Sequence, residues 1–322
     1  MSTGTPLFTV GPPPHWRAES SITRMNYAYI LALLPAAGVG CIAYGFGPEA
    51  LQSLGVGTGV FSRALGFLVR ELGIPVAVFS MIGAMAVVAL GMGTGILAEY
   101  AVQILFRQPY HVTNGHGALM GLIIGVMMPP TVPWWVVVVG VTIAIVVGKQ
   151  IYGGIGAYPF HPAMIGWMIL LLSWQNHIYP VGMDSIAAQH EVVIFFTFLG
   201  GIMLVALGHV RWQIPLGVIL GVALSTPLFH LAKPELAGPL AQLATGNVML
   251  AAFFISSDST CSPVNHAPML IYGVFTGAMI MLIRTFGVWP DAVPFAVLLM
   301  NVASPLLDKI HPRPVKVVIQ HG

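Results

Sequence analysis

A glycine-rich stretch between two apolar segments carries the residue types best suited to hold a flat ligand. Its glycines let the backbone turn and come close to a ligand, because they have no side chain. Its last two residues stand at the start of the next segment, where the free N–H groups of a helix favour an electron-rich acceptor. A helix–helix turn without a ligand is the alternative interpretation, since such turns are often rich in glycine. The candidate cofactor-binding residues are Lys149, Gly153, Gly154, Gly156, Tyr158, His161 and Pro162.

Two acidic residues are candidates for an ion path. Asp258 lies in the polar run 256–260, directly after an apolar segment. A carboxylate at membrane depth is costly and usually serves a site, a partner or an ion path. Asp308 follows the last apolar segment, and a solvated helix end explains it equally well. Asp291 precedes that segment, and we expect it to cap the N-terminus of the helix.

The histidines form no diagnostic motif. His111, His116, His161 and His266 could gather on the cytoplasmic side, and His116 and His161 are weak candidates for haem ligands. The sequence contains no Walker loop, no dinucleotide fingerprint, no CxxC and no zinc-ligand spacing. We therefore expect no metal-ion site, and neither hydrolysis nor soluble-type hydride transfer within this chain.

The elements that position these residues are expected to be membrane helices. Of the 322 residues, 57% are hydrophobic and 7% are charged, whereas a soluble domain has about 25% charged residues. A membrane helix needs about 20 mainly apolar residues. The candidate segments are 26–46, 75–99, 117–129, 134–148, 160–175, 192–208, 214–231, 246–256, 269–286 and 291–306. The sequence therefore predicts an all-α polytopic membrane protein with about ten transmembrane helices.

Two of these segments are short and end in helix-breaking residues. Segment 117–129 ends at a proline pair, and segment 246–256 runs into the polar run that contains Asp258. Such backbone is tolerated at membrane depth only where protein or a polar cavity covers it. Each short segment is followed by two more, which predicts two five-helix halves, 26–175 and 192–306, in opposite orientation.

Positive charge predicts the orientation of the chain. With both termini in the cytoplasm of a bacterium, whose inner membrane the chain would span, more Lys and Arg residues fall on the inner side than on the outer side. The inner residues are Arg17, Arg24, Arg107, Lys149, Arg211, Lys309, Arg313 and Lys316. The remaining parts are a cytoplasmic segment 1–25, an interfacial helix or loop 49–73, an outer loop 176–191 and a cytoplasmic tail 307–322.

Several motifs along nearly the whole chain resemble the NqrB/RnfD family, and the RnfD branch more closely. They are residues 147–156, 159–166 and 249–255 with Asp258, Pro290-Asp291 with 295–301, Pro129-Pro130 to Trp134-Trp135, and Pro14-His15. The resemblance implies a fold of ten membrane helices in two inverted repeats, similar to urea transporters.

The resemblance also implies a function. Family members are subunits of redox-driven ion translocases, of the ferredoxin:NAD or NADH:quinone type, that work beside iron–sulfur and flavin subunits. By this resemblance the chain is not active alone, moves Na⁺ or H⁺, contacts membrane lipid and binds no nucleic acid. Asp258 and Asp308 fall where the family has carboxylates associated with the cation path.

The family carries an FMN bonded to a threonine in the outer loop and a non-covalent riboflavin near the glycine turn, and this chain departs from both patterns. Its outer loop has no threonine, so we expect no covalent FMN, with Ser185 as a weak candidate for attachment. Tyr158 and His161 stand where the family commonly has asparagines. Both can hydrogen-bond a flavin, so we expect non-covalent riboflavin or FMN, with haem b as a less favoured ligand.

Two other functions stay open at this point. Broken helices in an inverted repeat also suit a transporter or channel for a small solute or ion without redox chemistry. A haem- or quinone-binding membrane anchor of another oxidoreductase is the third possibility.

Overall fold

The computed structural model describes residues 21–46, 76–107, 112–129, 132–178, 191–289 and 291–310. Every regular element in these ranges is helical. Five of the helices there are long and apolar enough to cross a membrane. Together with the scarcity of charged residues, this makes the chain a multi-pass helical membrane protein. The expected segments 49–73 and most of 176–191 lie outside the described residues.

The helices follow the apolar segments of the sequence. Those before residues 179–190 are α1 (Ile22–Phe46), α4 (Val76–Leu105), α5 (His116–Met127), α6 (Trp134–Val146) and α7 (Pro162–Ile178). Short 3₁₀ turns, η1 (Val112–Asn114) and η2 (Gln150–Tyr152), precede α5 and follow α6. Those after these residues are α8 (Glu191–Ala206), α9 (Gln213–His230), α10 (Pro239–Leu243), α11 (Val248–Leu250), the π-helix η3 (Ala251–Ile255), α12 (His266–Phe286) and α13 (Val293–Leu307).

The two expected helix breaks are present. Helix α5 ends at Met127, and Met128 has extended backbone angles before Pro129. The segment around α11 ends as a π-helix at Ile255, and turns follow from Ser256 onward. Sequence alone did not predict the π-helix or the short helix α10.

Helices α4 and α5 approach each other through glycines. A Cβ added at Gly121 would lie 2.0 Å from the carbonyl oxygen of Gly91, and one added at Gly95 would lie 2.0 Å from that of Gly117. No side chain can occupy these positions without moving backbone, so the small residues set the distance between the two helices. This close approach brings the end of α4 beside the start of α5.

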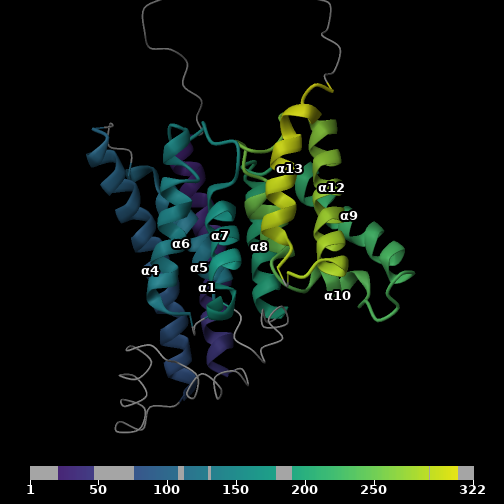
Figure 1. The fold of residues 1–322 in the computed structure, drawn as a ribbon, viewed down its shortest axis with the longest axis horizontal. Helices are drawn as coiled ribbons and strands as arrows, with labels where there is room; N and C mark the ends of the chain where they lie inside the picture. Colours follow the sequence, from purple (N-terminus) through teal and green to yellow (C-terminus); the bar gives the residue numbers. More distant parts are fainter. Residues whose placement is uncertain are drawn as a thin grey trace, which may run out of the picture.

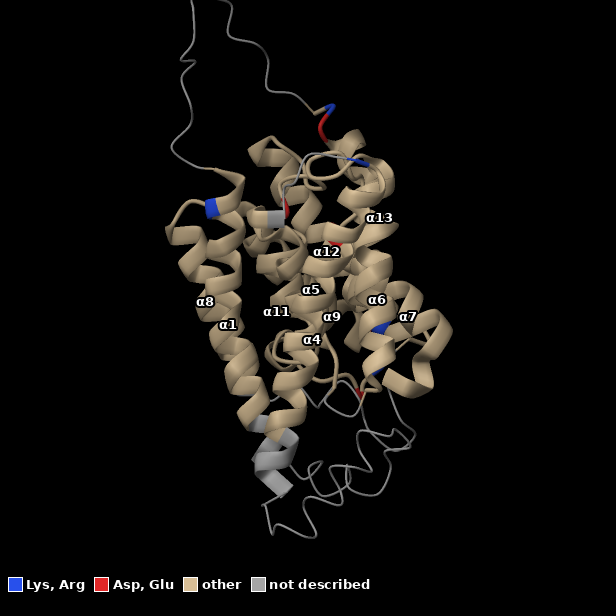
Figure 2. Cartoon of the chain, turned by 90° about the vertical axis from the view of Figure 1, so that its left-hand side faces the viewer, with Lys and Arg blue, Asp and Glu red and all other residues tan. Residues whose placement is uncertain are grey.

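The bundle has two ends that carry most of its charge. The start of α1 and the end of α13 lie at the same end of the bundle, which is the upper end in Figure 1. The coloured charged residues are few and lie mostly toward the two ends, and most of the length between them is tan (Figure 2). This distribution is typical of a protein whose middle faces lipid.

Candidate functional site

A buried ion pair lies between α4 and the residues that follow α6. Lys149 Nζ is 2.7 Å from Glu99 Oε1, and the two side chains are 1% and 2% exposed. Gln103, one turn along α4, donates from Nε2 to the same oxygen at 3.4 Å. Gly117 of α5 leaves room for the pair, because a Cβ there would lie 2.6 Å from Glu99 Oε2. Lys149 was among the ligand-binding candidates of the sequence, whereas Glu99 was missed.

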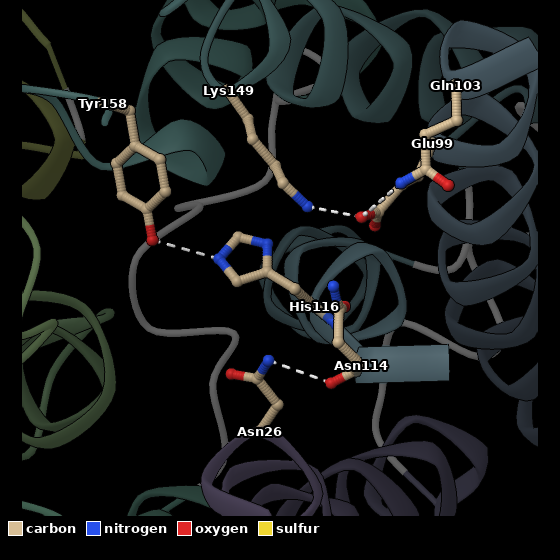
Figure 3. A network of polar contacts seen from close by, with 7 residues as sticks. All are labelled: Asn26, Glu99, Gln103, Asn114, His116, Lys149 and Tyr158. Atoms are coloured by element: carbon tan, nitrogen blue, oxygen red, sulfur yellow. Dashed lines mark hydrogen bonds and ion pairs between the residues drawn. The ribbon is translucent and has the colours of Figure 1, made fainter. Parts of the chain in front are cut away.

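His116 is held at the first turn of α5. Gly115 has the left-handed φ of 74° that turns the chain into the helix. Asn114 Oδ1 accepts the backbone N–H of His116 at 2.9 Å, and the Asn114 carbonyl accepts from Asn26 Nδ2 of α1, also at 2.9 Å. These contacts position the backbone of His116, and its ring Nε2 lies 3.0 Å from Tyr158 Oη (Figure 3).

Tyr158 joins the two parts of the chain. Its hydroxyl donates to Asp258 Oδ2 at 2.9 Å, and Asp258 Oδ1 accepts the backbone N–H of Thr260 at 3.0 Å. Tyr158 lies in the connection between α6 and α7, where burial, followed by the charge of Asp258, raises the pKa of the phenol well above its ordinary value. The hydroxyl has one proton and gives it to Asp258, so His116 Nε2 is the donor to Tyr158 Oη.

His161 directly precedes α7, and its side chain is 1% exposed. Asn301 of α13, oriented so that its oxygen accepts the backbone N–H of His161 at 3.0 Å, donates to Tyr272 Oη at 2.8 Å. The start of α7 is therefore attached to α13. Pro162, the first residue of α7, is buried.

Three buried polar atoms in this cluster have no hydrogen-bond partner within the described part of the chain. They are Glu99 Oε2, His116 Nδ1 and His161 Nδ1. Buried polar atoms in native proteins are nearly always paired, and an unpaired one costs about 1–3 kcal/mol. A polar ligand or ordered water is therefore expected beside them.

The glycine turn is the exposed side of the same region. Gly153, Gly154 and Gly156 all have positive φ, and no atom lies within 4 Å of a Cβ added at Gly154 or Gly156. The turn thus has open space on its outer face, while Tyr158 and His161 lie buried behind it. This arrangement has room for a flat ligand at the turn and hydrogen-bonding groups next to it.

Other candidates lie apart from this cluster. Asp308 caps the end of α13, where its Oδ1 accepts the backbone N–H of Val264 at 2.9 Å. His266 is exposed and pairs with Gln213, so it does not join His116 and His161. Ser185 and His111 lie outside the described residues.

Asp291 directly precedes Ala292, the N-cap residue of α13, so it is not itself the cap. Its Oδ1 accepts the backbone N–H of Val293, the first residue of the helix, at 3.1 Å. Its Oδ2 accepts from Trp167 Nε1 at 2.8 Å and from Asn247 Nδ2 at 3.0 Å. Nothing in the sequence signals these two contacts, because their partners lie 124 and 44 residues away.

Comparison with known proteins agrees with the resemblance. The model of the NQR2, RnfD, RnfE family matches residues 9–190 and 181–316. The D-type subunit of the ion-translocating oxidoreductase complex of Methanosarcina acetivorans is 27% identical over 95% of this chain and 96% of its own length. The protein of that name from Cronobacter sakazakii is 30% identical over 70% of this chain and 85% of its own length. Because the family model covers most of the sequence and both relatives align over most of their length, the chain belongs to the NQR2, RnfD, RnfE family.

Proposed function

We propose that this chain is the membrane subunit of an Rnf-type electron-transport complex, in which it holds a redox cofactor and couples electron transfer to ion movement. Relatives that align over most of their length are named as a subunit of an ion-translocating oxidoreductase complex. The observation that carries the proposal is the buried cluster of Glu99, His116 and His161, whose unpaired atoms adjoin an open glycine turn. The chain works beside iron–sulfur and flavin subunits in the bacterial inner membrane, with both termini cytoplasmic.

The proposed cofactor is a flavin, riboflavin or FMN, held without a covalent bond. Gly153, Gly154 and Gly156 give the ring system room, and Tyr158 and His161 offer hydrogen-bonding groups beside it. Lys149 lies close behind and carries a positive charge paired with Glu99. The flavin supplies one- and two-electron chemistry, and the protein supplies its position and electrostatic surroundings.

We further propose that the two parts of the chain are inverted repeats of five membrane helices each. Equivalent positions of the two parts support this. Gly115, with φ 74°, precedes α5, and Gly246, with φ 66°, stands just before α11. His116 follows Gly115 and bonds Tyr158, which lies four residues before α7. Asn247 follows Gly246 and bonds Asp291, which lies two residues before α13. Such a pairing of broken helices is typical of transport proteins.

Asp258 and Asp308 are the proposed ion path. Asp258 follows the π-helix, is half-buried and contacts Tyr158 from the other part of the chain. Asp308 lies at the end of α13 and is attached to the loop that contains Asp258 through Val264. The two carboxylates are thus connected through one loop.

The second candidate is a haem-binding anchor, favoured by two buried histidines. His116 Nε2 already contacts Tyr158, so ligation of haem iron through that atom would break this bond. A transporter without redox chemistry is the third candidate, and it rests on the broken helices alone.

An absorbance spectrum of the purified subunit separates these functions. For a non-covalent flavin we expect a band at about 450 nm, and we expect acid precipitation to release the flavin from the protein. A flavin that stays with the precipitated protein would contradict the non-covalent attachment. A Soret band would support the haem anchor instead. Neither band, together with solute flux in vesicles, would replace the redox function by transport.

A further inference from the structure

We propose that His116, Tyr158 and Asp258 form a proton-conducting chain, so that the ion moved through this protein is H⁺. The inference rests on the proposed function, since it names the ion of redox-coupled transport. The three side chains come from the start of α5, the connection after α6 and the loop after η3. Two hydrogen bonds of 3.0 and 2.9 Å join them without a gap.

The two hydrogen bonds of the proton-conducting chain point in the same direction. His116 Nε2 donates to Tyr158 Oη, and Tyr158 Oη donates to Asp258 Oδ2. Asp258 is half-buried, whereas Tyr158 is 2% and His116 is 4% exposed. The chain therefore leads from a buried ring to a carboxylate within reach of solvent.

The buried end of the chain is a nitrogen that can accept a proton. With its proton on Nε2, neutral His116 has a lone pair on Nδ1, and that atom has no partner among the described residues. In Figure 3 the ring lies between Tyr158 and the Lys149–Glu99 pair. A second buried acceptor without a described partner, Glu99 Oε2, lies in the same pair.

One proton passes along the three hydrogen-bonded side chains in a balanced step. A hydronium ion gives its proton to His116 Nδ1 and becomes water. His116 Nε2 passes its own proton to Tyr158 Oη, whose proton moves to the Asp258 carboxylate. His116 is then neutral with its proton on Nδ1, Tyr158 is neutral, and Asp258 is a carboxylic acid that releases its proton to solvent. Reorientation of the imidazole and the hydroxyl restores the first state.

Among the described residues, no group of three or more His, Cys, Asp or Glu side chains is placed to hold a metal ion. Both oxygens of Asp258 accept hydrogen bonds, from Tyr158 and from the backbone of Thr260, so the carboxylate is bonded directly to the proton donor that precedes it. The other titratable groups close to the chain are Glu99, Lys149, His161, Tyr29, Cys261 and Tyr272.

Proton movement per electron in vesicles tests the proposal. The complex, purified through this chain, is placed in liposomes with an internal pH dye, and electron transfer is started with a reductant in Na⁺-free buffer. Wild type is expected to change the internal pH with each electron. Tyr158→Phe, which keeps the ring and removes the relay hydroxyl, is expected to lower the ratio of protons to electrons by at least about tenfold.

The matched control is Thr226→Val in α9, which also removes a buried hydroxyl, bonded to the carbonyl of Val222, and has no contact with the three relay residues. It is expected to keep the wild-type ratio. An unchanged ratio in Tyr158→Phe would overturn the proposal, and so would a wild-type complex that moves ²²Na⁺ but no protons. The wild-type result decides even if the variant does not assemble. Absence of flavin or of electron transfer would instead overturn the proposed function.

Discussion

Lys149 Nζ lies 2.7 Å from Glu99 Oε1, so an ion pair joins the segment after α6 to α4 inside the bundle. The pair connects two residues that are 50 positions apart in sequence. It holds the start of the glycine turn against α4 and lies directly beside His116 (Figure 3). The ion pair therefore helps to position the start of the glycine turn beside His116.

Breaking the Lys149–Glu99 ion pair on one side should destabilise the protein. Glu99→Gln leaves the Lys149 ammonium buried without its counter-charge, which costs about 3–5 kcal/mol. A clearly lower thermal unfolding midpoint in detergent is the expected result. Glu235→Gln is the control, because that side chain is exposed. If Glu99→Gln unfolded at the wild-type temperature, the ion pair would not stabilise this region.

The crossing of α4 and α5 should tolerate no side chain at its contact glycines. Gly121→Ala places a methyl group 2.0 Å from the Gly91 carbonyl oxygen, and overpacking of this kind costs about 1–3 kcal/mol or more. We expect a lower yield of folded protein and a lower unfolding temperature. Gly93→Ala on α4 is the matched control, since nothing lies within 4 Å of its added Cβ. Equal yields of the two variants would contradict the packing described for these helices.

The hydrogen bond from Trp167 to Asp291 should stabilise the start of α13. Trp167→Phe keeps an aromatic ring and removes the N–H that bonds Asp291 Oδ2 at 2.8 Å. A hydrogen bond to a charged group is worth about 1.5–3 kcal/mol, so the free energy of unfolding should fall by that amount. Trp134→Phe, at a position that is 63% exposed, should leave the unfolding free energy nearly unchanged. A smaller effect at Trp167 than at Trp134 would refute the role given to this contact.

Asp258→Asn should uncouple ion movement from electron transfer. The amide keeps the shape of the carboxylate, so the yield of assembled complex should stay near wild type. It removes the charge and the proton-accepting oxygen opposite Tyr158, so ions moved per electron should fall strongly. Both quantities are measured on the same preparation, the first by chromatography and the second in vesicles. Coupling that persists at the wild-type ratio would remove Asp258 from the ion path.

The sequence predicted the helices well, because helices that face lipid require long apolar segments, which are easily recognised. Each expected apolar segment overlaps a helix in the described residues, and both breaks fall where proline or polar runs interrupt the pattern. The π-helix Ala251–Ile255 could not be predicted, since its residues are as apolar as those of an α-helix.

The site was predicted only in part, for a different physical reason. The residue types of Tyr158, His161 and Asp258 drew attention by themselves. Their contacts depend on the packing of segments about a hundred residues apart, such as Tyr158 and Asp258. Glu99 was missed because it stands at the edge of an apolar segment, where an acidic residue is ordinarily solvated.

A redox titration of the purified subunit, followed by its absorbance, tests the electron-carrying role directly. We expect a bound flavin whose band at about 450 nm bleaches on reduction and returns on oxidation, and which acid precipitation releases. A correctly folded subunit that shows no reducible chromophore would contradict the electron-carrying role.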